Sequence, residues 1–136
     1  MMNISGLAYV VAETTDLAKW KGYAEGVLGM MTAPAPDGGL YVRMDERQFR
    51  FAVQPGARDA YVVSGWEVTG RADFDHALQV LHDAGVEVTM GDAAQCRLRC
   101  VQQMAGFSDP SGNRHELVWG FRSDFAHFAS PAGVSR

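Results

Sequence analysis

The sequence predicts an α+β protein built from two tandem βαβββ units, and three observations lead to this prediction. In each half of the chain an apolar strand pattern is followed by an amphipathic helix pattern. Each helix pattern ends at a glycine, Gly29 or Gly85, and glycine commonly ends helices. The helices are offset by 57 residues at Asp16 and Asp73 and by 56 at their glycine ends, so they occupy matching places in two units. The alternative is a single α+β domain with two helices over one antiparallel sheet.

The first unit is expected over about residues 4–56. It opens with a short apolar strand at 4–12, and Thr14-Thr15-Asp16 then supplies residues that commonly cap helix N-termini. Apolar residues recur at helical spacing over about 16–28, with charged residues on the other side. Three further extended segments are expected in this unit, at 30–32, 40–44 and 49–53, with a turn at Asp45-Glu46 before the last of them.

The second unit is expected over about residues 60–122 and repeats the same order. A strand at 61–68 precedes a helix over about 71–84, whose apolar residues again share one face. Three more strands are expected at 86–90, 97–104 and 115–119. The turn-forming run Asp109-Pro110-Ser111-Gly112-Asn113 precedes the last strand, and residues 123–136 form a C-terminal tail.

Composition places the 136-residue chain among ordinary globular proteins, with 47% hydrophobic and 21% charged residues. Twelve Lys and Arg against sixteen Asp and Glu give a net charge of −4, whereas nucleic-acid binders usually carry a basic excess on one face. We therefore expect no nucleic-acid partner. The sequence has no apolar run of membrane-spanning length and no signal-peptide pattern, so we expect a soluble cytoplasmic protein with no membrane partner.

The two cysteines, Cys96 and Cys100, lie four residues apart in the segment expected to be extended. In a strand they would share a face about 13 Å apart, at about 3.3 Å per residue, which is too far for a disulfide. We expect reduced thiols with a structural role, since no histidine is near them in sequence and a reducing compartment suits such thiols.

Specific residues on this framework resemble a known family. The first helix is similar to the pattern D-x-x-x-W-x-x-F/Y-x-x-x-x-L-G of the vicinal oxygen chelate superfamily, and more narrowly of type I extradiol catechol dioxygenases. The matching residues are Asp16-Leu17, Trp20, Tyr23 and Leu28-Gly29. Residues 107–117 resemble the superfamily signature F-x-D-P-x-G-x-x-x-E-L, and the stretches 50–56, 65–68 and 91–92 resemble the 2,3-dihydroxybiphenyl 1,2-dioxygenase type.

The resemblance is to the first of the two tandem domains of those dioxygenases. It implies one cupped, mostly antiparallel eight-stranded sheet with the two main helices outside. In that family the second domain holds Fe(II) on two histidines and a glutamate, whereas the first has the same fold without a metal. The resemblance therefore implies that this chain is a non-catalytic N-terminal domain, as a fragment or as a stand-alone relative, with no cofactor of its own.

The superfamily's metal-ligand positions, carried onto this chain by the resemblance, fall on Tyr9, about Val63 and Glu116, with Gln54 at the matching strand end of the first unit. Tyr9 and Val63 do not supply the two imidazoles that a facial iron triad needs. Glu116 is expected to be satisfied by a neighbour such as an arginine or a backbone N–H. No catalytic, cofactor-binding or metal-binding residue is therefore predicted.

The four histidines are expected to be surface or packing residues rather than ligands. His76 and His82 lie six apart on a helix and cannot converge. His115 neighbours Glu116 on a strand, so the two point to opposite faces, and His127 lies in the tail.

Two further functions remain open from the sequence. A metal-free relative could bind a small aromatic ligand in the cup, and this requires a cup that is open and apolar rather than filled by residues such as Trp66, Phe107 and Trp119. The tryptophans could stack on such a ligand, but core packing is the expected role of all three, Trp20, Trp66 and Trp119. A metal-dependent glyoxalase-type enzyme would need ligands at Tyr9 and Val63.

The expected protein partners are a catalytic domain or a second copy of the chain. A domain that normally packs on a neighbour exposes an apolar face when alone. The tail carries Phe125 and Phe128, so the sequence predicts a homodimer with these residues at the contact.

Overall fold

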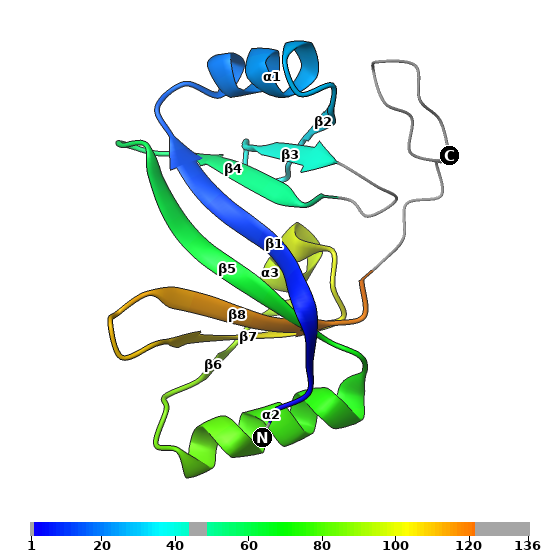
Figure 1. Ribbon diagram of the computed structural model, residues 1–136, viewed down its shortest axis with the longest axis vertical. Coiled ribbons are helices and arrows are strands. Elements are labelled where there is room, and N and C mark those ends of the chain that lie inside the picture. Colours follow the sequence, from blue (N-terminus) through cyan, green and yellow to red (C-terminus); the bar gives the residue numbers. More distant parts are fainter. Residues whose placement is uncertain (1, 44–48, 122–136) are drawn as a thin grey trace. The chain divides into compact units, whose positions relative to one another are not determined.

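The computed structural model describes residues 2–43 and 49–121. They form two compact units, and each is described by itself: the α1 unit, residues 9–43 and 49–62, and the α2 unit, residues 2–8 and 63–121. Strand β1 (Ile4–Thr14) contributes to both units, and so does β5 (Ala60–Val68), because the division falls within each of these strands. Figure 1 shows the order of the elements along the chain.

The α1 unit has four strands in the order β2-β3-β4-β1. Its other elements are α1 (Leu17–Gly26), β2 (Met31–Pro34), β3 (Leu40–Arg43) and β4 (Phe51–Pro55). β1 pairs with β4 in parallel, while β2–β3 and β3–β4 are antiparallel.

Local chemistry defines both ends of α1. The Asp16 side chain caps the N-terminus by accepting a hydrogen bond of 3.0 Å from the Lys19 amide. Beyond the C-terminus, Gly29 has a φ of +67°, as the predicted helix stop requires. The buried Ala24 anchors the helix to a core cluster with Leu40, Val42 and Val53.

The α2 unit also has four strands, in the order β5-β8-β7-β6. Its other elements are α2 (Arg71–Asp83), β6 (Thr89–Met90), α3 (Ala93–Arg99), β7 (Gln103–Ser108) and β8 (Arg114–Trp119). β5 pairs with β8 in parallel, while β7–β8 and β6–β7 are antiparallel.

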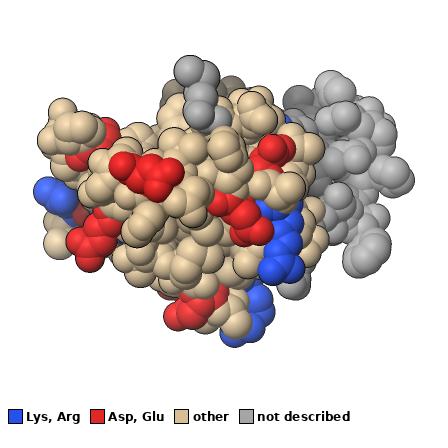
Figure 2. Space-filling view, turned by 90° about the horizontal axis from the view of Figure 1, so that it is seen from below, with Lys and Arg blue, Asp and Glu red and all other residues tan. Residues whose placement is uncertain are grey.

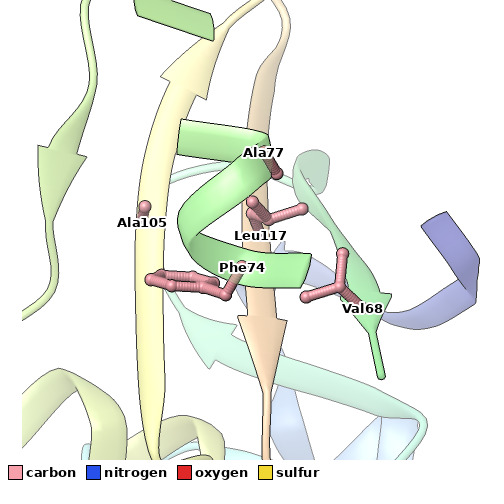
Figure 3. Close-up of a cluster of buried hydrophobic side chains, with 5 residues drawn as sticks. All are labelled: Val68, Phe74, Ala77, Ala105 and Leu117. Atoms are coloured by element: carbon pink, nitrogen blue, oxygen red, sulfur yellow. The ribbon is translucent and has the colours of Figure 1, made fainter. Parts of the chain in front are cut away.

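Helix α2 covers one face of this sheet. Phe74 and Ala77 of α2 are fully buried against Ala105 of β7, Leu117 of β8 and Val68 of β5, as Figure 3 shows. The outer side of α2 is solvated and carries an ion pair between Arg71 and Asp75 at 3.9 Å. In the view of Figure 2, acidic and basic side chains lie interspersed on the surface. Helix α2 thus has the amphipathic character that its sequence predicts.

Two tandem βαβββ units and eight strands are confirmed, and four of the six strand pairings within the units are antiparallel. The first helix is shorter than predicted, and the strand predicted at 86–90 is reduced to β6. The turn predicted at Asp45-Glu46 and the tail at 123–136 lie outside the described residues. Within the described ranges, no helix is both long and apolar enough to cross a membrane.

The prediction of a strand at 97–104 is wrong in its first half. Residues 93–99 form the short helix α3, because Asp92 and Gln95 make a capping box: the Asp92 carboxylate accepts from the Gln95 amide, and the Gln95 side chain accepts from the Asp92 amide. Cys96 therefore lies in a helix, and Cys100 is its C-cap. Neither cysteine is in a disulfide, and both are partly buried.

Candidate functional site

The candidate site lies on β8, where His115 and Glu116 point to opposite faces of the α2-unit sheet. Leu117, which shares the face of His115, packs under α2, so Glu116 lies on the face turned away from that helix. In register with Glu116 are Gly65 of β5 and Gly106 of β7. Glu116 is therefore flanked on both neighbouring strands by residues without a side chain.

Arg99 meets Glu116 on this face. Its Nε donates to Oε1 at 2.8 Å and its Nη2 donates to Oε2 at 3.2 Å, which is a two-point ion pair. The two side chains are only 10% and 13% exposed. An arginine partner of Glu116 was among the sequence expectations, and Arg99 is that partner.

The end of α3 positions Arg99. The capping box fixes the start of the helix, and the last turn closes with the Val101 amide donating to the Cys96 carbonyl. Cys100 then adopts the left-handed region with φ 59° and is the one non-glycine residue with positive φ among those described. This sharp exit turns the chain from α3 towards β7 immediately after Arg99.

On the other face, His115 is held by two partners. The Trp66 indole N–H donates to Nδ1 at 3.0 Å, so the proton of the neutral ring lies on Nε2, which donates to Asp109 Oδ2 at 2.9 Å. The Phe107 ring stacks on the imidazole at a centroid distance of 5.4 Å. His115 is therefore a packing residue that links β5, β8 and the preceding turn.

Asp109 organises the turn before β8. One carboxylate oxygen accepts from the amides of Ser111 and Asn113, both at 2.9 Å, while the other faces His115. The hydrogen bond from His115, followed by that from the Asn113 amide, lowers the pKa of Asp109 from 3.8 to about 2. The carboxylate is thus held in its charged form as a structural anchor.

The residues at the superfamily's ligand positions do not fit an iron(II) site. Tyr9 is buried and its ring lies 5.1 Å from that of Phe49, and Val63 is buried and aliphatic. Val63 shares the face of Glu116, because it lies two residues before Gly65 on β5. The remaining carboxylate is already bound to Arg99. In the described part of the chain, His, Cys, Asp and Glu form no group of three that could hold a metal ion.

The tryptophans have the packing roles predicted for them. Trp66 and Trp119 lie with Phe107 against the core cluster under α2, on the face opposite Glu116, so they do not cover it. The Trp119 indole donates to Gln103 at 2.8 Å. Trp20 packs against the core cluster of the α1 unit.

A hollow opens on the surface of each unit. That of the α1 unit, about 420 Å³, lies beside the start of α1 and is lined by residues that include Trp20, Tyr23 and Asp59. Hydrogen bonds from the Thr15 amide and the Thr14 hydroxyl lower the pKa of Asp59. The hollow of the α2 unit, about 490 Å³, lies between the end of α2 and the turn at Asp109. Neither hollow is lined by Glu116.

Sequence reasoning did not single out Arg99, and it placed Asp109 in a turn without assigning a role to its side chain. The anchoring role of Asp109 could have been inferred, because an aspartate at the start of a turn commonly accepts hydrogen bonds from the backbone of that turn. Arg99 could not be assigned while its segment was expected to be a strand.

The sequence of the chain is similar to those of known extradiol dioxygenases. A family model described as dihydroxybiphenyl dioxygenase BphC D1 matches residues 7–56. An iron-dependent extradiol dioxygenase of Rhodococcus jostii (strain RHA1) is 38% identical over 133 residues, which cover 97% of this chain and 44% of that protein. A biphenyl-2,3-diol 1,2-dioxygenase of Paraburkholderia xenovorans (strain LB400) is 36% identical over 98% of this chain and 45% of its own length.

The fold of the chain is also similar to those of solved dioxygenase structures. The crystal structure of BphC, a halotolerant catechol dioxygenase, matches with a TM-score of 0.87 at 31% identity, over 94% of this chain and 43% of that one. The crystal structure of a catechol 2,3-dioxygenase matches with a TM-score of 0.84 at 28% identity. The match covers 91% of this chain and 42% of that one. The chain spans less than half the length of these relatives. In sequence and in fold, it belongs to the vicinal oxygen chelate superfamily, as a domain of the N-terminal type found in extradiol dioxygenases.

Proposed function

We propose that this chain is a non-catalytic domain that acts as the N-terminal half of an extradiol dioxygenase for catechol-type substrates. The observation that carries the proposal is the set of side chains at the superfamily's ligand positions. They are a buried phenol at Tyr9, a buried aliphatic side chain at Val63 and a carboxylate at Glu116 that is bound to an arginine. Two imidazoles and an available carboxylate would be needed for iron(II).

The proposed role is that of a scaffold and a contact surface for a catalytic domain. The relatives named as extradiol dioxygenases are more than twice as long as this chain, which supports a second domain as the partner. Iron supplied by that second domain would carry out the ring cleavage, and no step of it is assigned to residues of this chain. The same role leaves this chain without a cofactor of its own.

The experiment that tests the absence of activity uses the purified 136-residue chain. The chain is incubated anaerobically with iron(II), freed of unbound metal, analysed for iron and then exposed to air with catechol, 3-methylcatechol or 2,3-dihydroxybiphenyl. We expect no bound iron and no coloured ring-cleavage product. Stoichiometric iron and turnover, both lost in Glu116→Gln, would overturn the proposal.

The scaffold role is tested by a chimera. The N-terminal half of the Paraburkholderia xenovorans enzyme is replaced by this chain, and the chimera is compared with the isolated catalytic half of that enzyme. We expect the chimera to recover ring-cleavage activity that the isolated half lacks. A folded chimera with no more activity than the isolated half would contradict a scaffold role.

A second candidate is a metal-free domain that binds a small aromatic ligand. The hollow beside α1 favours it, because Trp20 and Tyr23 line this hollow together with Lys19 and Asp59. Rings and hydrogen-bonding groups around one hollow are typical of sites for small aromatic molecules. Calorimetric titration with catechol and phenol tests this candidate, with Tyr23→Ala as the variant that should weaken binding. An absence of binding heat in the native chain would exclude it for these ligands.

A further inference from the structure

We propose that the hollow beside the start of α1 selects neutral aromatic molecules that carry a hydroxyl group, and that Asp59 accepts the hydrogen bond from this hydroxyl. The hollow has a volume of about 420 Å³, and all the residues that line it belong to the α1 unit. The inference rests on the second candidate function, the binding of a small aromatic molecule, and adds the chemical group by which such a molecule is recognised.

One oxygen of the Asp59 carboxylate holds the side chain in place. Oδ1 accepts from the Thr14 hydroxyl at 2.8 Å and from the Thr15 amide at 3.1 Å. Thr14 is only 3% exposed, and its hydroxyl also accepts from the Asp16 amide at 3.1 Å, so the support of Asp59 is itself fixed. No hydrogen bond from the described residues reaches Oδ2 of Asp59. This second oxygen is therefore available as an acceptor for a ligand.

Two aromatic side chains line the hollow together with this acceptor. Trp20 and Tyr23 lie three residues apart on α1, so their side chains share one side of the helix. Trp20 packs against the core of the α1 unit, which fixes its ring, whereas Tyr23 is 51% exposed. Aromatic surface beside a fixed hydrogen-bond acceptor suits a ligand whose ring carries a donor.

The charges around the hollow favour a neutral ligand. The hydrogen bond from the Thr15 amide and, more weakly, the Lys19 ammonium lower the pKa of Asp59, so its carboxylate stays charged. The carboxylates of Asp16 and Asp59 would repel an anionic ligand, and the ammonium of Lys19 would repel a cationic one. A neutral hydroxyl avoids both repulsions, and its hydrogen bond to a charged acceptor is stronger than one between neutral groups.

The test is a titration of the isotope-labelled 136-residue chain with phenol and with anisole, followed by the shifts of amide signals in NMR spectra. The two ligands share the aromatic ring, but anisole lacks the hydroxyl donor. We expect phenol to produce saturable shifts at the amides of Thr15 and Tyr23. The dissociation constant of anisole should be at least about tenfold larger, which is the factor expected for the loss of one hydrogen bond to a charged group.

Asp59→Asn should abolish this preference for phenol. The amide oxygen of asparagine can still accept from Thr14 and Thr15, whereas its NH₂ group takes the place of Oδ2 and is a donor. Asp37→Asn is the matched control, because Asp37 is another aspartate of the α1 unit that accepts from a backbone amide, that of Gly39 at 2.8 Å, but it does not line the hollow. The preference should persist in this control.

The role assigned to Lys19 is tested with a cationic ligand, benzylammonium. The native chain should bind benzylammonium more weakly than phenol. Lys19→Met keeps an unbranched stem without the charge and should bind benzylammonium more tightly than the native chain does. Unchanged binding in Lys19→Met would overturn the preference for neutral ligands. This comparison and that of phenol with anisole need no change at Asp59, so they decide the inference even if Asp59→Asn does not fold.

The outcomes separate this inference from the functions on which it bears. Equal dissociation constants for phenol and anisole in the native chain would overturn the inference and leave the aromatic-binding candidate standing. A preference for phenol that survives in Asp59→Asn would overturn the role of Asp59. If neither ligand shifts the amides beside the hollow, the candidate and the inference are both wrong. The scaffold role is decided by the chimera and is independent of these titrations.

Discussion

Gly112 is the residue that allows the chain to turn into β8. Its φ of +86° lies in the left-handed region, and its amide donates to the Asp109 carbonyl at 2.9 Å. Gly112→Val should therefore lower the free energy of unfolding by about 1 kcal/mol or more, because a β-branched residue is strained at positive φ. Urea titration followed by circular dichroism measures the change.

Gly22 of α1 provides a matched comparison for Gly112. No positive φ is found there, and a Cβ added at Gly22 would meet no atom within 4 Å. Gly22→Ala should raise the free energy of unfolding by about 0.5–1 kcal/mol, because alanine loses less backbone entropy in a helix than glycine does. Equal effects of the two substitutions would contradict the turn assigned at Gly112.

The anchor at Asp109 predicts a dependence of stability on pH. Its pKa is about 2 in the folded chain, below the value of 3.8 for an unperturbed carboxyl. Its contribution is therefore fully present above pH 3.8 and is lost as the pH falls towards 2. The difference in unfolding free energy between the native chain and Asp109→Asn should narrow as the pH is lowered through this range. Urea titrations from pH 7 to 2 measure it, and a constant difference would refute the anchor role.

The stability of helix α3 depends strongly on its capping box, because the helix is short. A seven-residue helix is marginal by itself, so the reciprocal bonds between Asp92 and Gln95 carry much of its stability. Asp92→Ala should lower the free energy of unfolding by about 1 kcal/mol, whereas Asp92→Asn should have a smaller effect because asparagine is also a good cap. Thermal unfolding of the two variants provides the comparison, and equal losses would contradict the capping role.

The same helix shows where prediction from the sequence failed. The two main helices were predictable because their apolar residues repeat at helical spacing over more than two turns and a glycine follows each. Helix α3 is too short for such a repeat, and its Arg97-Leu98-Arg99 alternation is typical of a strand. The signal that could have found it is the pair Asp92 and Gln95, at capping-box spacing.

On β8, the directions of the side chains were predictable from the sequence, but the partner of Glu116 was not. The alternation of strand side chains was sufficient to predict that His115 and Glu116 point apart. The choice of Arg99 as the partner of Glu116 was not predictable, because it depends on how α3 and its strained exit position a side chain seventeen residues away in sequence.

The assembly of the chain in solution remains a prediction from the sequence. We expect a homodimer in which Phe125 and Phe128 contribute to the contact, and these residues lie outside the described part of the chain. Among the described residues, Tyr23, Val27 and Leu28 near the end of α1 are 51%, 69% and 45% exposed, which adds apolar surface. A stable interface should bury at least about 1,000 Å² in total, with an apolar centre.

Sedimentation equilibrium at micromolar concentration tests the dimer. A single species near 14.8 kDa would exclude it. The matched experiment removes the residues after Arg122 and should convert the dimer to a monomer. A dimer that survives the deletion would exclude the role of the tail.

The parallel pairing of β5 with β8 has a consequence for how the α2 unit folds. Partners such as Val63 and Arg114 lie about fifty positions apart in the sequence, and α2, β6, α3 and β7 all lie between them. The entropy of closing so long a loop must be overcome before this pairing contributes any stability, and contacts of high sequence separation slow folding. During synthesis, β5 therefore cannot pair with β8 until β8 has left the ribosome. By then nearly the whole α2 unit has been synthesised.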